Sequence, residues 1–162
     1  MLLASAITGT VVVNVDPLGL ASHYYQVKSF ICSESQVLCN PENVFTRLRQ
    51  YPAPFSGPSH IINPCDTTKI PVLGTVVHGV DSSKNTITNT TLPDHRLYPG
   101  QVTRSVVEEN GNIYVETTGT GEGDWAWANS VLADPLWGQV DQNIAAPWAP
   151  TVYNSEYAPW VQ

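Results

Sequence analysis

The sequence predicts a single α+β domain with an N-terminal helix, a central antiparallel sheet of about four strands from two hairpins, and one or two C-terminal helices. Three patterns support this class: a helix start at Asn40, two hairpin patterns between residues 74 and 113, and a capped apolar segment after them. The length of 162 residues is that of one ordinary domain, so one hydrophobic core is expected.

Two apolar runs precede the predicted helix. The first is strand-like and centres on residues 11–13, and the second covers residues 24–31. A turn-forming segment, residues 16–19, separates them. The predicted sheet does not include either run.

The helix is predicted from its own start and stop signals. Asn40 has the side chain of an N-cap, Pro41 suits the first helical position, and Glu42 suits the first turn. Apolar residues then recur on one helical face up to Tyr51. We expect the proline-rich residues 52–71 to form an irregular loop.

An approximate internal repeat predicts the sheet. Residues 74–80 (GTVVHGV) align with residues 100–106 (GQVTRSV), and each segment is followed by a polar turn and a returning strand. The second turn contains Asn110-Gly111, a strong hairpin signal because both residues tolerate positive φ. A simpler explanation stays open, since all hairpins draw on the same few turn residues.

The C-terminal part is predicted to be helical and then extended. The glycine-rich residues 119–123 are interpreted as a tight turn before a helix cap, and a helix follows over residues 125–133. A further short helix is expected over residues 136–146. The remaining residues, 147–162, are rich in proline and aromatic side chains and are expected to form an extended strap.

The composition counts against nucleic acid and membranes as partners. The formal net charge of −7 gives no long-range attraction to nucleic acid or to an anionic membrane. No apolar run approaches the ~20 residues that cross a bilayer, so no membrane span is expected.

The three cysteines do not have the spacing of a metal site. Cys32, Cys39 and Cys65 contain no CxxC pair and have no histidine at ligand spacing, so neither a bound metal nor another cofactor is expected. Cys32 and Cys39 are the easiest pair to close as a disulfide, provided that the compartment is oxidising.

The segment Asp16-Pro17-Leu18-Gly19-Leu20 resembles the DPxGL signature that ends the core of Rhs and YD-repeat proteins. The resemblance implies that residues 1–20 are a junction and that residues 21–162 are one globular effector domain, released from the shell as a toxin. It also implies secretion or delivery from a bacterium into a target cell, with a cytoplasmic stage before export, and a cognate immunity protein as partner. A chance turn of the same sequence is the alternative.

Three residues are candidates for catalysis by a metal-independent, ribonuclease-like phosphodiesterase that acts on RNA. His95 lies in a predicted turn and could move protons, Arg104 could neutralise a phosphate, and Thr118 could position it. Alternation points Arg104 toward the core, where it needs a carboxylate or an open cleft, and Glu116 is the expected carboxylate. A purely structural ion pair is the alternative for Arg104.

A noncatalytic binding module is the second functional hypothesis. Tryptophan and tyrosine side chains could form a surface that stacks on a glycan or binds a protein, with core packing as the alternative for most of them. The expected binding residues are His78, Glu116, Thr120, Trp125 and Trp127.

Overall fold

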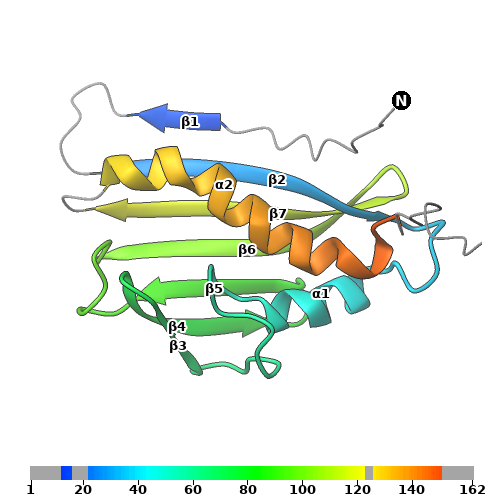
Figure 1. Cartoon of the computed structure of the whole chain (residues 1–162), viewed down its shortest axis with the longest axis horizontal. Helices are drawn as coiled ribbons and strands as arrows, with labels where there is room; N and C mark the ends of the chain where they lie inside the picture. Colours follow the sequence, from blue (N-terminus) through cyan, green and yellow to red (C-terminus); the bar gives the residue numbers. More distant parts are fainter. Residues whose placement is uncertain (1–11, 16–21, 123–125, 151–162) are drawn as a thin grey trace, which may run out of the picture.

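The computed structural model describes residues 12–15, 22–122 and 126–150, with side chains described for residues 24–121 and 135–150. These residues form one antiparallel seven-stranded sheet, and both helices lie on the same face of it (Figure 1). The strands are β1 (Val12–Val15), β2 (Ser22–Ser33), β3 (Thr67–Ile70), β4 (Gly74–Asp81), β5 (Thr86–Thr91), β6 (Gly100–Glu109) and β7 (Asn112–Glu122). The helices are α1 (Pro41–Gln50) and α2 (Ala126–Ala145), followed by the 3-10 turn η1 (Ala146–Trp148).

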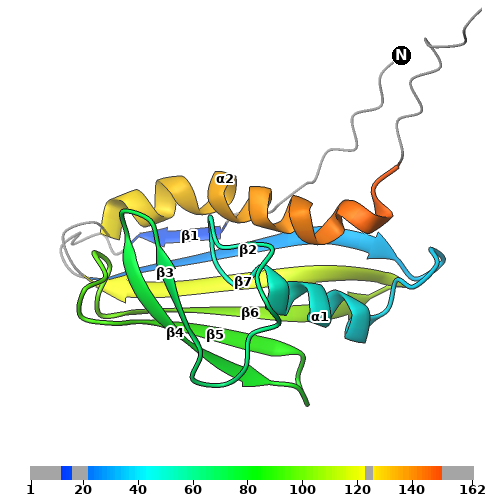
Figure 2. The same ribbon diagram turned by 60° about the horizontal axis from the view of Figure 1, so that its bottom comes forward.

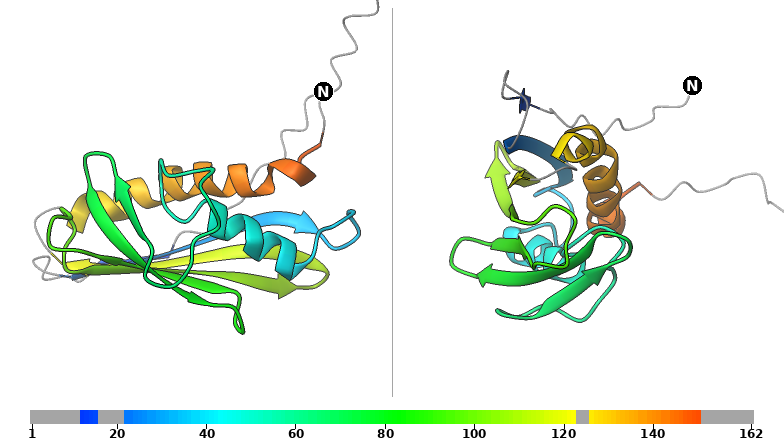
Figure 3. Two further views of the ribbon diagram at one scale, coloured as in Figure 1. Left: turned by 90° about the horizontal axis from the view of Figure 1, so that it is seen from below. Right: turned by 90° about the vertical axis from the view of Figure 1, so that its left-hand side faces the viewer.

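The sheet curves around the helices. Its strand order is β1-β2-β7-β6-β5-β4-β3. Figure 2 shows α2 running along β2 and β7, with α1 beside its C-terminal half. In Figure 3 the strands curl toward the helix side, which makes that face concave. The main core therefore lies between the concave face and the two helices.

Both predicted hairpins are confirmed. β4 pairs with β5 up to Asp81 and Thr86, and β6 pairs with β7 up to Glu109 and Asn112. The second turn uses positive φ at Asn110 (52°) and Gly111 (74°), as the Asn-Gly signal requires.

The predicted number of strands and the predicted place of the first helix are wrong. β2 pairs along nearly all of β7, and β1 adds to its other edge, so both N-terminal apolar runs belong to the sheet. β3 lies inside the region expected to be an irregular loop and pairs with β4. The first helix is therefore not N-terminal, because two strands precede it. Pairing with distant strands brought β1 and β2 into the sheet, and pairing with β4 overrode the proline-rich, loop-like pattern around β3.

The predicted helix itself is confirmed. The Asn40 side chain accepts a hydrogen bond of 2.8 Å from the backbone N–H of Asn43, and a proline begins the helix. Its buried face consists of Val44, Phe45 and Leu48. Cys32 and Cys39, the pair named as the easiest to close, form a disulfide that joins the end of β2 to the segment that leads into α1.

The C-terminal helical region is one continuous helix. This helix, α2, continues through Pro135, where one or two helices were expected. Glycines 119 and 121 lie within β7, so the expected tight turn does not begin at residue 119. No helix in the described part of the chain is long and apolar enough to cross a membrane.

Several predictions fall outside the described residues. The DPLGL segment lies in residues 16–21 and Trp125 in residues 123–125, and most of the expected aromatic strap lies beyond residue 150. The junction over residues 1–20 stays a prediction, although the part of it that forms β1 pairs with β2.

Candidate functional site

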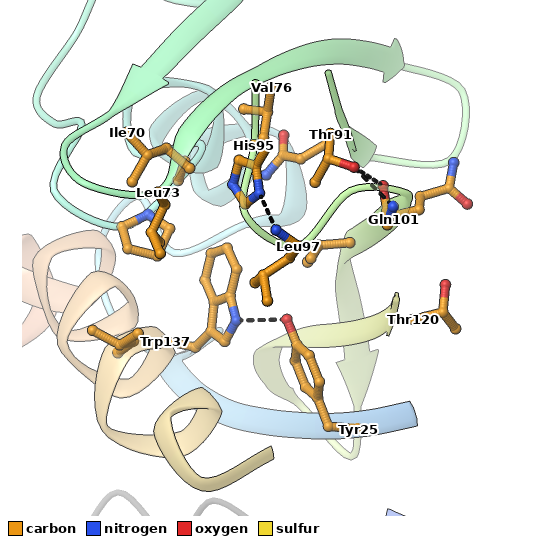
Figure 4. Close-up of a pocket in the computed structure, with 16 residues that line it drawn as sticks. Tyr25, Ile70, Leu73, Val76, Thr91, His95, Leu97, Gln101, Thr120 and Trp137 are labelled. Carbon is orange, nitrogen blue, oxygen red and sulfur yellow. Dashed lines mark hydrogen bonds between the residues drawn. The ribbon is translucent and has the colours of Figure 1, made fainter. Parts of the chain in front are cut away.

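A pocket remains between α2 and the concave face of the sheet (Figure 4). The space not filled by atoms in and around it amounts to about 580 Å³, a figure that includes open solvent at its mouth. The loops at residues 53–54 and 95–100 complete its wall. Its larger apolar side chains are Tyr25, Ile70, Leu73, Val76, Leu97, Val102, Leu136 and Trp137.

A row of residues across the sheet forms the floor of this pocket. The strand registers place Asn89, Val102, Gly119 and Tyr25 next to one another on β5, β6, β7 and β2. Gly119 has no side chain, and this leaves room for the Tyr25 ring, which would lie 2.2 Å from a Cβ atom at that position. The small residue in β7 thus allows a large aromatic ring in β2 to lie across it.

Tyr25 and Trp137 form a buried hydrogen-bonded pair on the pocket wall. The Trp137 indole Nε1–H donates to the Tyr25 hydroxyl oxygen at 3.0 Å. Tyr25 is 1% exposed, and burial raises the pKa of its phenol to about 12. Tyr25 is therefore neutral and keeps its hydroxyl hydrogen at physiological pH.

His95 lines the pocket from the turn between β5 and β6. Its backbone N–H donates to the Leu92 carbonyl, and its Nδ1 accepts from the Leu97 N–H at 3.1 Å. At Gly74 a Cβ atom would lie 2.5 Å from the His95 Cα, so glycine allows the start of β4 to pack against this turn. Burial lowers the pKa of the His95 imidazole, which favours the neutral ring.

Arg104 is fully buried in the next row of the sheet, and it does not line the pocket. Its guanidinium pairs with Asp141, donates to the Tyr51 carbonyl at 2.8 Å and donates to the Thr117 hydroxyl at 3.2 Å. The Trp137 ring covers it, with 4.6 Å from the guanidinium carbon to the ring centroid. Its N–H groups are thus directed at partners within the protein, which leaves no open face for a phosphate.

The expected partner of Arg104, Glu116, is not the actual one. Glu116 lies on the outer face of β7, where it accepts a hydrogen bond of 2.6 Å from Gln26. The true partner, Asp141, also accepts from the Ser29 hydroxyl at 2.6 Å. Burial raises the pKa of the Asp141 carboxyl, and the contacts with Arg104 and Ser29 partly offset this effect.

The three predicted catalytic residues do not meet around one cleft. His95 faces the pocket and Arg104 is closed in behind Trp137. Thr118 lies opposite Gln26, on the same outer face as Glu116. This arrangement gives no support to the ribonuclease hypothesis, which stays a prediction.

The predicted binding residues have different surroundings. His78 is 2% exposed and its two ring nitrogens contact Asn89 Oδ1 and Thr68 Oγ1, both at 2.7 Å, so it is a structural residue. Thr120 lines the pocket and is exposed, which places it at the mouth. The side chain of Trp127, within α2, is outside the described part of the structure.

Sequence reasoning missed Tyr25 and Leu97 as site residues, and it considered Trp137 only as part of an aromatic surface. The alternation of Tyr25 with Val27 was a signal for Tyr25, because it marks one buried strand face. No local pattern indicated Trp137, since its role depends on how α2 packs. Within the described residues, no group of three His, Cys, Asp or Glu side chains could hold a metal ion.

Comparisons with known proteins give similarities of fold only. No protein-family model matches the chain, and no curated protein matches it. A crystal structure of CalU16 from Micromonospora echinospora is 11% identical, with a TM-score of 0.46 over 87% of this chain and 94% of that one. A crystal structure of protein Ms6760 from Mycobacterium smegmatis is 16% identical, with a TM-score of 0.48 over 88% of this chain and 98% of that one. At these values the likeness carries no information about function.

Proposed function

We propose that this domain binds a small, largely apolar molecule in the pocket between α2 and the sheet. The observation that carries the proposal is the pocket itself, because protein interiors normally pack with few voids larger than a water molecule. A concave, mainly apolar hollow with a few polar groups has the general character of a small-molecule site.

The lining of the pocket indicates an uncharged ligand. No Asp, Glu, Lys or Arg side chain is among the described residues that line it. Arg104, the nearest buried charge behind Trp137, is already paired with Asp141. A charged guest would lose its hydration without gaining an opposite charge, and this is costly in an apolar site.

This proposal retains the binding-module hypothesis and changes its ligand. Tyr25 and Trp137 are nearly fully buried and line an internal pocket, so they are unavailable for stacking on a glycan at the surface. An Rhs-type effector role, RNA as a substrate and a cognate immunity protein stay predictions that rest on the sequence alone.

Binding of a neutral apolar fluorophore, N-phenyl-1-naphthylamine, tests the proposal. We expect saturable binding with enhanced fluorescence, and a loss of affinity of about tenfold or more in Val102→Phe, where the larger side chain fills the floor of the pocket. Val37→Phe is the matched control, because Val37 is 84% exposed and lies outside the pocket.

Circular dichroism and urea unfolding of both variants establish that they remain folded. Equal affinities for folded Val102→Phe, folded Val37→Phe and the unmodified protein would overturn the proposal, as would the absence of saturable binding.

A further inference from the structure

The hydroxyl hydrogen of Tyr25 has no acceptor among the described residues. The oxygen of this hydroxyl accepts from Trp137 Nε1, whereas its hydrogen has no partner in the described part of the chain. The side chain is 1% exposed and lines the pocket. Tyr25 therefore presents a hydrogen-bond donor to the interior of the pocket.

His95 presents a second donor. The Leu97 N–H occupies the lone pair of Nδ1, so the neutral ring carries its hydrogen on Nε2. Nε2 has no acceptor in the part of the chain that the structure describes, and the residue is 7% exposed. Figure 4 shows His95 and Tyr25 on opposite sides of the pocket, with Leu97 and Trp137 between them.

The other buried polar groups of the pocket already have partners. The Thr91 hydroxyl donates to the Gly100 carbonyl and accepts from the Gly100 N–H. The Asn89 amide contacts His78 through its oxygen and donates to the Pro52 carbonyl through its nitrogen. Within the described residues, the buried lining therefore has two donors without an acceptor, while its other buried polar side chains already have partners.

From this imbalance we propose that the ligand is an uncharged apolar molecule with a carbonyl oxygen, which accepts a hydrogen bond from Tyr25 or His95. Ketones, esters and quinones belong to this class. The proposal rests on the proposed function and narrows it. A hydrocarbon, or a ligand that offers only donors, would leave both buried donors without an acceptor.

Three tricyclic compounds of similar shape separate these possibilities. Fluorene has no polar group, 9-fluorenone adds a carbonyl, and carbazole has an N–H donor in the same position. Measured by displacement of N-phenyl-1-naphthylamine, 9-fluorenone is expected to bind about tenfold more tightly than either of the others, the effect of one buried hydrogen bond.

The outcomes distinguish the two proposals. If none of the three compounds and no fluorophore binds, the proposed function fails and this inference fails with it. If all three compounds bind equally, or carbazole binds most tightly, the pocket is a ligand site and only the carbonyl inference is overturned.

Two variants test whether Tyr25 and His95 cause the preference for 9-fluorenone. Tyr25→Phe removes the hydroxyl, and His95→Asn retains an oxygen that can accept from the Leu97 N–H while its amide N–H donors lie closer to the backbone than Nε2 does. At least one of them is expected to reduce the preference for 9-fluorenone over fluorene by about tenfold. The controls are Tyr98→Phe and His60→Asn, which change exposed residues outside the pocket. An undiminished preference in both folded variants contradicts the inference.

An infrared measurement on the unmodified protein covers the case in which a variant does not fold. The carbonyl stretch of bound 9-fluorenone, labelled with ¹³C at the carbonyl, is expected at lower frequency than in hexane, because a hydrogen bond weakens the C=O bond. A frequency equal to that in hexane would show a carbonyl without a donor and would overturn the inference.

Discussion

A Cβ atom at position 119 would lie 2.2 Å from the Tyr25 ring, so this single glycine determines whether the ring can lie on the pocket floor. We expect Gly119→Ala to lower the free energy of unfolding by about 1–3 kcal/mol, because the ring or the strand has to move. Gly138→Ala, in α2, is the control, because a Cβ atom added there has no packing neighbour within 4 Å. This variant should raise the free energy of unfolding by about 0.5–1 kcal/mol. Urea unfolding followed by tryptophan fluorescence measures both. Equal effects would contradict the close contact.

The buried pair of Arg104 and Asp141 gives a second prediction at the scale of single residues. Arg104→Met leaves the Asp141 carboxylate buried without its cation, and we expect a loss of about 3–5 kcal/mol in the free energy of unfolding. Glu109→Gln, which breaks the partly exposed pair with Lys28, should cost less than about 1 kcal/mol. Chemical denaturation compares the two. A loss for Arg104→Met as small as that for Glu109→Gln would show that the pair is dispensable.

The alternation of inward and outward side chains along β6 predicted part of the arrangement around Arg104. It placed Arg104 on the buried face and required a partner for it, and both statements are confirmed. The same alternation excludes Glu116, because its neighbour Thr117 is the residue opposite Arg104. Asp141 could not be identified from the sequence, since its position depends on which face of α2 packs against the sheet.

At the scale of elements, His78 links three strands and makes their stability depend on pH. Burial lowers the pKa of His78 below the value of about 6.5 that it has in the unfolded chain. The unfolded state therefore binds a proton at a pH where the folded state does not. Stability should be constant above about pH 7 and should fall as the pH drops through 6.5 toward 5.

Urea unfolding between pH 7.5 and pH 5 measures this dependence. We expect a shallower decline in His78→Gln, although this variant is less stable at every pH because contacts with Asn89 and Thr68 change. His95 contributes in the same direction, since burial also lowers its pKa. The same pH dependence in His78→Gln as in the unmodified protein would contradict the assignment to His78.

The disulfide between Cys32 and Cys39 gives a prediction about the junction of β2 and α1. It closes a loop with a sequence separation of 7, and replacing both cysteines with serine should lower the free energy of unfolding by about 2–3 kcal/mol. Cys65→Ser, at the exposed free cysteine, is the control and should be neutral. Thermal unfolding without reductant compares them, and a neutral double variant would contradict a stabilising role.

Local signals predicted the elements that depend on local chemistry. The Asn40 cap and the Asn110-Gly111 turn are examples, because capping and turn formation involve neighbouring residues. β2 and β3 were missed as members of the sheet because their pairing partners are distant or lie in a proline-rich region. Whether one or two helices follow β7 stayed open in the sequence because Pro135 removes one backbone donor, and in the structure α2 continues through it.

At the scale of the whole molecule, the pocket is formed by parts of the chain that are far apart in sequence. Tyr25 comes from β2, His95 from the turn before β6, and Trp137 from α2. The sequence could place His95 in a turn, but it could not predict that this turn faces a tryptophan across a cavity. For the same reason the sequence suggested Trp137 as part of an aromatic surface, whereas in the structure it is buried.

The most direct test is to locate a bound ligand by NMR. With methyl-labelled protein and 9-fluorenone, intermolecular nuclear Overhauser effects are expected to the methyl groups of Leu73, Val76 and Leu97, which line the pocket. Contacts only to the outer face of the sheet, where the exposed Phe30 contacts the Tyr114 ring, would contradict binding between α2 and the concave face.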